Sequence, residues 1–303
     1  MNNKSHDIRD VFFNNVKKIF LKNKRNYILT NDSDVFALKS LRNNKRFIDA
    51  GVAEQNLINI SAGLAKYDKL PLVYGFCTFL TFRCYEQLRF NIASHNLNIK
   101  IIGIGPGFSF PYDGPTHHGT QDIYLMYLIP EFEIYNISDN NLANEISKKI
   151  NKIKGPAYIR IDKGNLNYNR NIKYNIEKGY ELIFRSNIKK TLIITSGIFC
   201  KNAIEVANSN SGISVINLFK FKKFNKSSFL SLIKKYKKII VYDESSENGG
   251  IVPILKKIFI QNRLNRKIYT LTSSDKQIFD YFQDRGLMIK KLKLDKKSLI
   301  KFI

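Results

Sequence analysis

IKIIGIGPGFSFPYDGPTHHGTQDIYLMYLI, residues 99–129, contains the pattern that decides the fold of this chain. Its first seven residues are mostly β-branched and stop at a glycine-rich loop, as a buried strand does. A helical pattern follows the loop and is interrupted before Pro130, because the residue before a proline is disfavoured in a helix. The stretch therefore predicts a strand, a loop and a helix in direct succession.

Outside this stretch, strand and helix patterns alternate in the same way over the first half of the chain. Short apolar runs predict strands at 27–32, 47–51, 71–76, 133–138 and 157–162. Apolar residues at helical spacing predict helices at 11–23, 53–67, 81–95 and 141–153. Because continuous apolar strands that alternate with helices form parallel sheets covered on both faces, we predict an α/β fold with three layers.

A second domain follows a polar segment. KGNLNYNRNIKYNIEKG (163–179) has no sustained period and predicts a linker. Beyond it the alternation resumes, with strands predicted at 191–197, 213–219, 238–244 and 267–273. We therefore expect two parallel-sheet domains, at 1–165 and 179–303, joined by a linker at 166–178.

The composition is that of an average soluble globular protein. Of the 303 residues, 44% are hydrophobic and 25% are charged, which excludes a disordered tail or a collagen-like fibre. No apolar run approaches the roughly 18 residues that cross a bilayer, and MNNKSHDIRD (1–10) lacks the apolar region of a signal peptide. We therefore expect a cytoplasmic protein without a membrane partner.

The charge is strongly basic, with 50 Lys and Arg against 25 Asp and Glu. The basic residues are spread along the chain beside Asn and Ile, and no finger, RNP-type or basic-zipper pattern accompanies them. This pattern is typical of a lysine-rich solvated surface, so binding to nucleic acid or another polyanion is only an alternative. Three cysteines without a CxxC pair and four histidines without ligand spacing predict neither a disulfide framework nor a metal site.

Glu54 is a candidate functional acid. It lies in FIDAGVAEQN (47–56), just after a predicted strand and at the start of a predicted helix. Open α/β sheets bind ligands at the carboxyl ends of their strands, which favours a functional role. Acidic residues are also common in the first turn of a helix, which is the purely structural alternative.

Two further motifs carry candidate site residues. TFLTFRCYEQLR (78–89) contains aromatic residues about three positions apart: Phe79, Phe82 and Tyr85. This spacing is typical of a buried helix face, although such rings can also line a ligand site. PYDGPTHHG (111–119) carries Asp113, His117 and His118 on a loop after a strand. Polar residues on such loops are often functional, and adjacent histidines beside an aspartate are hard to explain as core packing.

These motifs resemble, in order and spacing, the carboxyl-terminal half of transketolases. FIDAGVAEQN, TFLTFRCYEQLR, DGPTHHG and YIRIDKG (158–164) carry the resemblance in the first domain. In the second domain it rests on SGIFCKNAIEVAN (196–208), VINLFKFKKFN (215–225) and VYDESSENGG (241–250). The resemblance implies a pyrimidine-binding domain for thiamine diphosphate, followed by a transketolase C-terminal-like domain. The pattern is also similar to 1-deoxyxylulose-5-phosphate synthase.

The resemblance implies a role for Glu54 in thiamine diphosphate chemistry. Glu54 matches the glutamate that hydrogen-bonds N1′ of the cofactor's aminopyrimidine and favours its imino tautomer. A carboxyl that exchanges a proton in this way is expected to lie in a dry pocket and to have a raised pKa. Phe79, Phe82 and Tyr85 match the family's aromatic wall around the aminopyrimidine.

Four residues match substrate-binding positions of the family. Asp113 and His117 match residues that hydrogen-bond sugar hydroxyls or assist proton transfer, and His118 has a counterpart in some members. Arg160 matches an arginine that contacts the substrate phosphate, for which a bidentate guanidinium is suited. The structural alternatives are a loop-capping Asp113 with a solvated His117, and a surface Arg160 at a strand end.

The chain also departs from the family. Transketolases have a histidine at the position of Gly105, and the synthases have an arginine at that of Pro106. Both contribute to substrate recognition, so the usual sugar-phosphate specificity does not follow for this chain.

The GDG…N segment with which the family holds the diphosphate and Mg²⁺ is absent from this sequence. The resemblance therefore implies an N-terminal partner subunit that supplies this segment, in a dimer or a two-plus-two assembly.

We accordingly expect a subunit of a transketolase-like transferase that moves a two-carbon ketol unit between sugars or sugar phosphates. Synthase-like or 2-oxoacid-decarboxylating chemistry with the same Glu54 is one alternative. A non-catalytic subunit that stabilises a partner is another, although Glu54, His117 and the aromatic residues argue against it.

Overall fold

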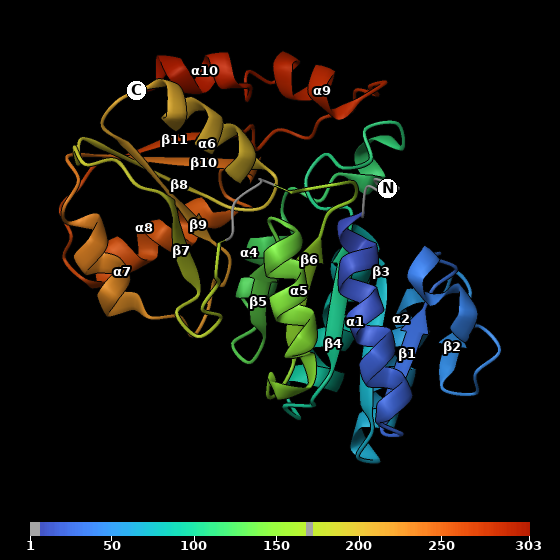
Figure 1. The fold of residues 1–303 in the computed structure, drawn as a ribbon. Helices are drawn as coiled ribbons and strands as arrows, with labels where there is room; N and C mark the ends of the chain where they lie inside the picture. Colours follow the sequence, from blue (N-terminus) through green and yellow to red (C-terminus); the bar gives the residue numbers. More distant parts are fainter. Residues whose placement is uncertain (1–6, 168–171) are drawn as a thin grey trace, which may run out of the picture. The chain divides into compact units, whose positions relative to one another are not determined.

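The structure, a computed structural model, describes residues 7–167 and 172–303, which form two compact units (Figure 1). The first unit contains the chain up to Pro106 and continues from Leu125. The second contains Gly107–Tyr124 together with the carboxyl-terminal part from Ile172. The loop with the histidine pair thus belongs with the carboxyl-terminal part. Residues 168–171 of the predicted linker lie outside the described residues.

The first unit is built on a parallel six-stranded sheet in the order β2-β1-β3-β4-β6-β5. Its strands are β1 (Asn26–Thr30), β2 (Phe47–Asp49), β3 (Leu70–Phe76), β4 (Lys100–Ile104), β5 (Glu133–Asn136) and β6 (Ala157–Ile161). Every residue of β4 and of β6 is buried, as expected for central strands covered on both faces. The prediction of a parallel α/β sheet is therefore confirmed here.

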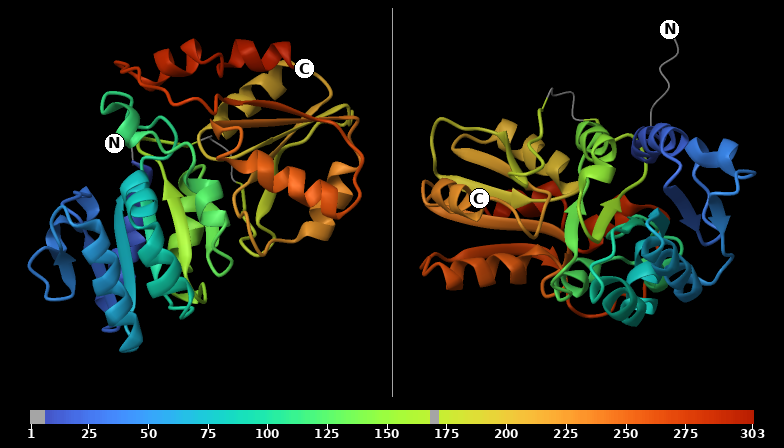
Figure 2. Two further views of the ribbon diagram at one scale, coloured as in Figure 1. Left: turned by 180° about the vertical axis from the view of Figure 1, so that it is seen from behind. Right: turned by 90° about the horizontal axis from the view of Figure 1, so that it is seen from below.

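Helices cover both faces of this sheet. On one face lie α1 (Ile8–Lys22) and α5 (Asn140–Lys148), packed side by side (Figure 1). On the other lies α2 (Glu54–Lys66), together with the helical turns η2 (Phe79–Arg83), α3 (Tyr85–Gln87) and η3 (Leu88–Ala93) (Figure 2). The unit also contains the short helical turns η1 (Phe36–Leu41) and η5 (Ile150–Lys152). The helix α4 (Asp122–Tyr127) begins in the second unit and continues into the first.

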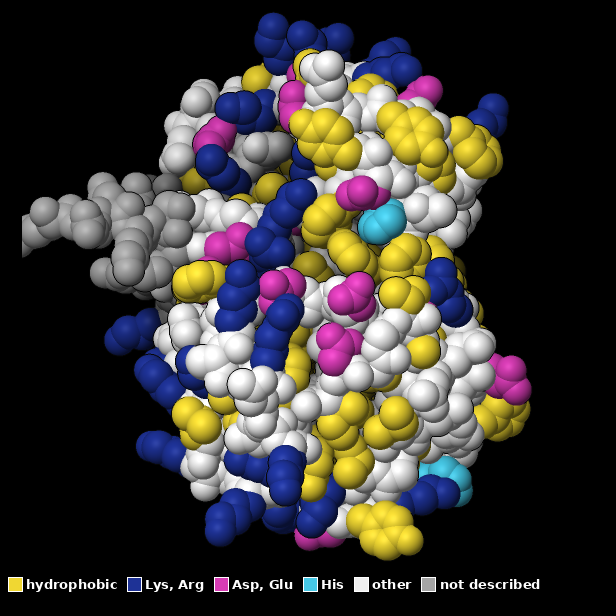
Figure 3. Space-filling model, turned by 90° about the vertical axis from the view of Figure 1, so that its right-hand side faces the viewer, with side chains coloured by type: hydrophobic (Ala, Val, Ile, Leu, Met, Phe, Trp, Pro, Cys, Tyr) yellow, Lys and Arg dark blue, Asp and Glu magenta, His cyan; other side chains and the backbone are white. Residues whose placement is uncertain are grey.

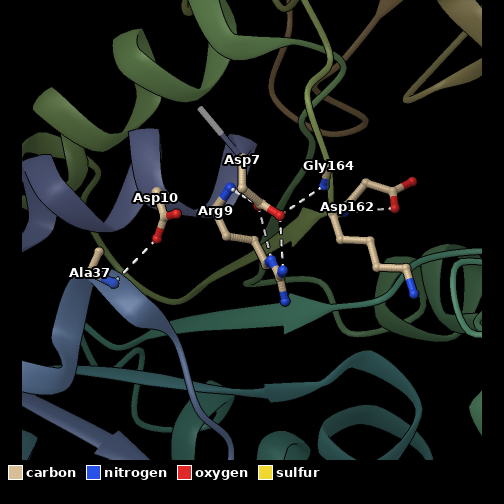
Figure 4. Close-up of polar contacts among 7 residues, drawn as sticks. Asp7, Arg9, Asp10, Ala37, Asp162 and Gly164 are labelled. Carbon is tan, nitrogen blue, oxygen red and sulfur yellow. Dashed lines mark hydrogen bonds and ion pairs between the residues drawn. The ribbon is translucent and has the colours of Figure 1, made fainter. Parts of the chain in front are cut away.

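Polar contacts tie the first turn of α1 to the loop that follows β6 (Figure 4). The Asp7 carboxylate caps the helix by accepting a hydrogen bond from the backbone N–H of Arg9 at 2.8 Å. It also accepts from the Gly164 backbone N–H at 2.9 Å and from the Arg9 side chain at 2.9 and 3.0 Å. Burial raises the pKa of Asp7, but these hydrogen bonds outweigh it and hold that pKa below its ordinary value.

The second unit contains a five-stranded sheet in the order β11-β10-β8-β9-β7. Its strands are β7 (Tyr180–Phe184), β8 (Thr191–Thr195), β9 (Ile213–Leu218), β10 (Lys238–Ser246) and β11 (Ile268–Ser273). All neighbouring pairs are parallel except β7 with β9, which is antiparallel. The predicted parallel sheet is thus confirmed, with one antiparallel edge strand that the sequence pattern did not indicate.

Helices cover this second sheet on both sides (Figure 1). On one face lie α7 (Lys226–Ile233) and α8 (Ile251–Gln261). On the other lies α6 (Phe199–Ser209), against which α10 (Lys296–Lys301) packs, with α9 (Arg285–Lys291) preceding it in the chain. The chain crosses from β9 past β8 to β10, so the loops after β8 and β10 run in opposite directions. Such a switch point is where open α/β sheets hold ligands or loops.

The face of the molecule drawn in Figure 3 carries its charge in a dispersed pattern. In Figure 3, Lys and Arg side chains are spread over this face, and Asp, Glu and hydrophobic side chains lie between them. Within residues 7–167 and 172–303, none of the helices has the length and hydrophobicity of a bilayer span.

Candidate active site

Glu54 is the first residue of α2 and lies just beyond the carboxyl end of β2. The turn between them uses Gly51 at φ +65°, a conformation that glycine adopts without steric cost. Only 2% of Glu54 is exposed, which is unusual for an acidic residue. Its position at the end of a parallel strand agrees with the expected place of a ligand site.

Two side chains bind the Glu54 carboxylate. The amide Nδ2 of Asn31, just after β1, donates to Oε1 at 3.0 Å. The guanidinium Nη1 of Arg83, at the end of η2, donates to Oε2 at 2.7 Å. A β-carbon on Gly75 in β3 would lie only 2.1 Å from the Asn31 side-chain oxygen, so the amide lies directly against the strand. Each carboxylate oxygen therefore accepts a hydrogen bond from one side chain, and the two side chains come from different segments of the first unit.

The pKa of Glu54 is lowered in this structure, whereas the sequence led us to expect a raised pKa. Burial raises it, but the backbone N–H of Glu54 and then the hydrogen bonds from Arg83 and Asn31 outweigh burial and lower the pKa below its ordinary value. The physical reason is that these donors, with the guanidinium charge next to Oε2, favour the ionised form. In this chain by itself Glu54 is thus an ionised, paired carboxylate at neutral pH.

The aromatic residues come from a widened helix. η2 and η3 are π-helical turns, a rare geometry that is common at functional sites. Phe79 and Tyr85 are half-buried, and Phe82 is 41% exposed, so the three rings do not form a buried core face. The Phe79 ring packs edge-on against Phe76 at 5.7 Å, and the Arg83 guanidinium carbon lies 4.6 Å from the centre of the Phe79 ring.

The loop 107–124 carries the other candidates in the second unit. Asp113 is exposed, and its side chain does not cap the short turn η4 (Gly114–His117). His117 is half-buried, with Nδ1 2.9 Å from the Thr116 hydroxyl. His118 is only 5% exposed and packs edge-on against Phe108 at 5.2 Å between ring centres. Burial lowers the pKa of His118, so its imidazole is neutral at pH 7.

Backbone hydrogen bonds hold this loop against the carboxyl end of β10. The Ser246 N–H donates to the Thr120 carbonyl at 3.0 Å, and the Tyr124 N–H donates to the Gly249 carbonyl at 2.9 Å. A β-carbon on Gly249 would lie 2.6 Å from the Thr120 carbonyl oxygen, which shows how closely the two segments approach. The switch point of the second sheet is thus in contact with the histidine loop.

A buried ion pair supports the start of the same loop. Both carboxylate oxygens of Glu244 accept hydrogen bonds from the Arg285 guanidinium, a bidentate arrangement. A β-carbon on Gly107 would lie 2.0 Å from Glu244 Oε2, so the pair lies directly against the loop backbone.

Arg160 and Gly105 have environments that the sequence did not indicate. Arg160 is within β6 and is 2% exposed, so it is not a surface arginine at a strand end. Gly105 has φ +80°, its N–H donates to the Ile161 carbonyl at 3.2 Å, and its carbonyl accepts from the Cys77 thiol at 3.1 Å. Because residues with a β-carbon rarely adopt this φ, a histidine at this position would be strained.

The candidates therefore form two groups, one in each unit. Glu54 and Phe79 share a contact with Arg83 in the first unit, and the Asp113 and histidine positions share one loop in the second. Sequence reasoning missed Asn31 and Arg83. Asn31 follows a parallel strand, as Glu54 does, and that position was a usable signal. No group of His, Cys, Asp or Glu in the described parts of the chain could hold a metal ion.

Comparison with known proteins gives a consistent result. The model of the transketolase pyrimidine-binding domain matches residues 7–169, and that of the transketolase C-terminal domain matches residues 181–287. The 6-deoxy-6-sulfo-D-fructose transketolase subunit SqwH of Clostridium sp. (strain MSTE9) is 28% identical over 255 residues, which are 81% of this chain and 78% of that protein.

One relative is much longer than this chain, and one solved structure has nearly the same length. The 1-deoxy-D-xylulose-5-phosphate synthase of Dictyoglomus turgidum is 28% identical over 244 residues, which are 77% of this chain but 38% of the synthase. A solved structure described as a split gene transketolase, inactive beta4 tetramer, has a TM-score of 0.85 at 20% identity. It covers 97% of this chain and 96% of its own, so the two chains share their fold over nearly their full lengths.

Proposed function

The chain belongs to the transketolase family, and from this premise we propose that it is the pyrimidine-binding subunit of a split enzyme that depends on thiamine diphosphate. The enzyme transfers a two-carbon ketol unit between sugars in the cytoplasm. The observation that supports this most is Glu54, a carboxylate buried at the end of a parallel strand. An acidic residue in that position is costly unless it is used or paired.

The residues present fit the pyrimidine half of the cofactor. Oε2 of Glu54 already accepts a hydrogen bond from the planar guanidinium of Arg83, and that guanidinium lies over the Phe79 ring. When bound, thiamine diphosphate supplies a nucleophilic carbon and an electron sink for making and breaking carbon–carbon bonds. Glu54 would hold the proton at N1′, while Phe79, Phe82 and Tyr85 would stack on the aminopyrimidine and exclude water.

Substrate contacts are proposed for the second group of residues. The half-buried His117 and the exposed Asp113 would hydrogen-bond sugar hydroxyls, and His117 would move a proton during ketol transfer. The neutral His118 can donate from one ring nitrogen and accept at the other. Arg160, which is buried within β6, would contact a substrate phosphate.

A second chain would complete the enzyme. The matched domains are the pyrimidine-binding and C-terminal ones, and SqwH is named as a subunit. We propose that an N-terminal transketolase subunit supplies the residues that hold the diphosphate and Mg²⁺, in a hetero-oligomer of the two-plus-two kind.

Reconstitution tests this function. The chain is mixed with a transketolase-type diphosphate-binding subunit, thiamine diphosphate and Mg²⁺, and ketol transfer between sugar phosphates is measured. Glu54→Gln should keep the fold and lower kcat by about 10²–10⁴-fold, the usual contribution of a proton-transfer group. Glu86→Gln, at an exposed position in α3, is the control and should be fully active. Near-normal activity of Glu54→Gln would exclude the mechanism.

The similarity to 1-deoxy-D-xylulose-5-phosphate synthase favours one other reaction. Synthase-like chemistry would use the same Glu54 but would release CO₂ from a 2-oxoacid donor. Supplying pyruvate to the reconstituted enzyme and measuring CO₂ separates the two reactions, because ketol transfer between sugars releases none.

A further inference from the structure

Arg83 makes the same two kinds of contact with Glu54 and Phe79 that are expected of the cofactor's aminopyrimidine. Its guanidinium is planar, donates to Glu54 Oε2 at 2.7 Å and lies over the Phe79 ring at 4.6 Å. An aminopyrimidine is also planar, presents nitrogen-bound protons to a carboxylate and stacks on aromatic rings. One side chain of the protein thus makes both contacts that the proposed function assigns to the bound cofactor.

The two donors on Glu54 differ in their freedom to move. Asn31 is buried, and its amide lies against Gly75, where the backbone leaves no room for a β-carbon. The Arg83 side chain is 48% exposed, although its carboxylate partner is 2% exposed. A half-exposed guanidinium can swing into water and keep its charge solvated, whereas a buried amide cannot. Oε2 is therefore the carboxylate oxygen that can be vacated.

We propose that Arg83 is an internal stand-in for the aminopyrimidine, which pairs with Glu54 and covers Phe79 until the cofactor displaces it. The inference rests on the proposed function, since it concerns the same carboxylate. It explains how a subunit can carry a buried carboxylate before it meets its partner, because an unpaired buried charge is strongly destabilising. It also implies that cofactor binding competes with an intramolecular contact, which weakens the observed affinity.

The experiment measures thiamine diphosphate affinity in the reconstituted two-chain complex with Mg²⁺ by calorimetry. Arg83→Met removes the competing cation and keeps an unbranched apolar side chain over Phe79. The dissociation constant should fall about three- to tenfold, the range expected for a charged hydrogen bond that is partly exposed. Arg89→Met is the matched control, since the Arg89 guanidinium carbon also lies over an aromatic ring, 5.1 Å from the centre of Phe90. The affinity of this variant for thiamine diphosphate should not change.

Two further readouts test the stand-in role, one on the chain alone and one on the complex. Arg83→Met should lower the thermal midpoint of the chain alone, because Glu54 loses its charged partner, and Arg83→Lys should restore most of that loss. In the complex, the Nε resonance of Arg83 should shift when thiamine diphosphate is added. An unchanged or higher dissociation constant in Arg83→Met would overturn the stand-in role while leaving the proposed function intact. Failure of the wild-type complex to bind thiamine diphosphate would instead remove the proposed function, and the stand-in role with it.

Discussion

Asn31 and Gly75 face each other so closely that a β-carbon on Gly75 would fall 2.1 Å from the Asn31 Oδ1 atom. Asn31 directly follows β1, and Gly75 is in β3, which pairs with β1 in the sheet of the first unit. The same Asn31 amide donates to Glu54, so the glycine gives the carboxylate its fixed donor. The site thus depends on a residue that has no side chain of its own.

Gly75→Ala should therefore displace Asn31 and release Glu54 Oε1. We expect a loss of about 1–3 kcal/mol in stability, typical of overpacking, together with weaker thiamine diphosphate binding in the reconstituted complex. Gly63→Ala is the control, because a β-carbon at that exposed position in α2 meets nothing within 4 Å. It should be neutral or stabilise the helix by about 0.5–1 kcal/mol. Urea midpoints and calorimetry check both, and equal behaviour of the two variants would contradict the packing argument.

The Asp7 cap gives a prediction for acid pH. Its pKa is lower in the folded chain than in the unfolded one, so its stabilisation is present above the unfolded value of 3.8 and is lost as pH falls through the folded pKa. Asp7→Asn keeps a capping oxygen but removes the charge that binds Arg9. We expect a loss of about 1 kcal/mol at pH 7 and a smaller decline in stability below pH 4 than in the wild type.

Thermal melts between pH 2.5 and 7 check this prediction. Asp34→Asn is a suitable control, because Asp34 forms its ion pairs with Lys39 and Arg42 at the surface, where such pairs contribute little. If Asp7→Asn and the wild type lose stability in parallel as the pH falls, the cap does not have the assigned role.

The strands were predictable wherever burial is continuous. Every residue of β4 is buried, and its run of apolar residues is by itself enough to indicate a covered parallel strand. β7 was missed because it is a short, partly buried edge strand that pairs antiparallel, and neither length nor hydrophobicity distinguishes it from a loop. The sequence pattern thus identifies strands that are buried on both faces and misses a strand that is only partly buried at the edge of a sheet.

The chemistry of the site was less predictable than its location. Glu54 was found from its place after a strand, but its low pKa depends in part on Arg83, which lies 29 positions away in the sequence. Burial alone would have raised the pKa, and only the folded chain shows which charge lies beside the carboxylate. Arg83 lies within the aromatic motif, but π-helical turns have no sequence signature that would have revealed the direction of its side chain.

The second unit should control substrate use and leave cofactor affinity unchanged. A β-carbon on Gly249 would meet the Thr120 carbonyl and the Gln121 Cα at 2.6 Å, and neither backbone atom can rotate away as a side chain can. Gly249→Ala should therefore shift the segment that follows His118. Because a small misplacement of substrate-binding groups costs about 10²-fold in rate, kcat/KM for the sugar should fall by roughly that factor. Thiamine diphosphate affinity should stay within twofold, since Glu54 and Phe79 belong to the other unit. Steady-state kinetics and calorimetry on the reconstituted complex give both values, and a parallel loss of cofactor affinity would mean that the loop does more than position the substrate.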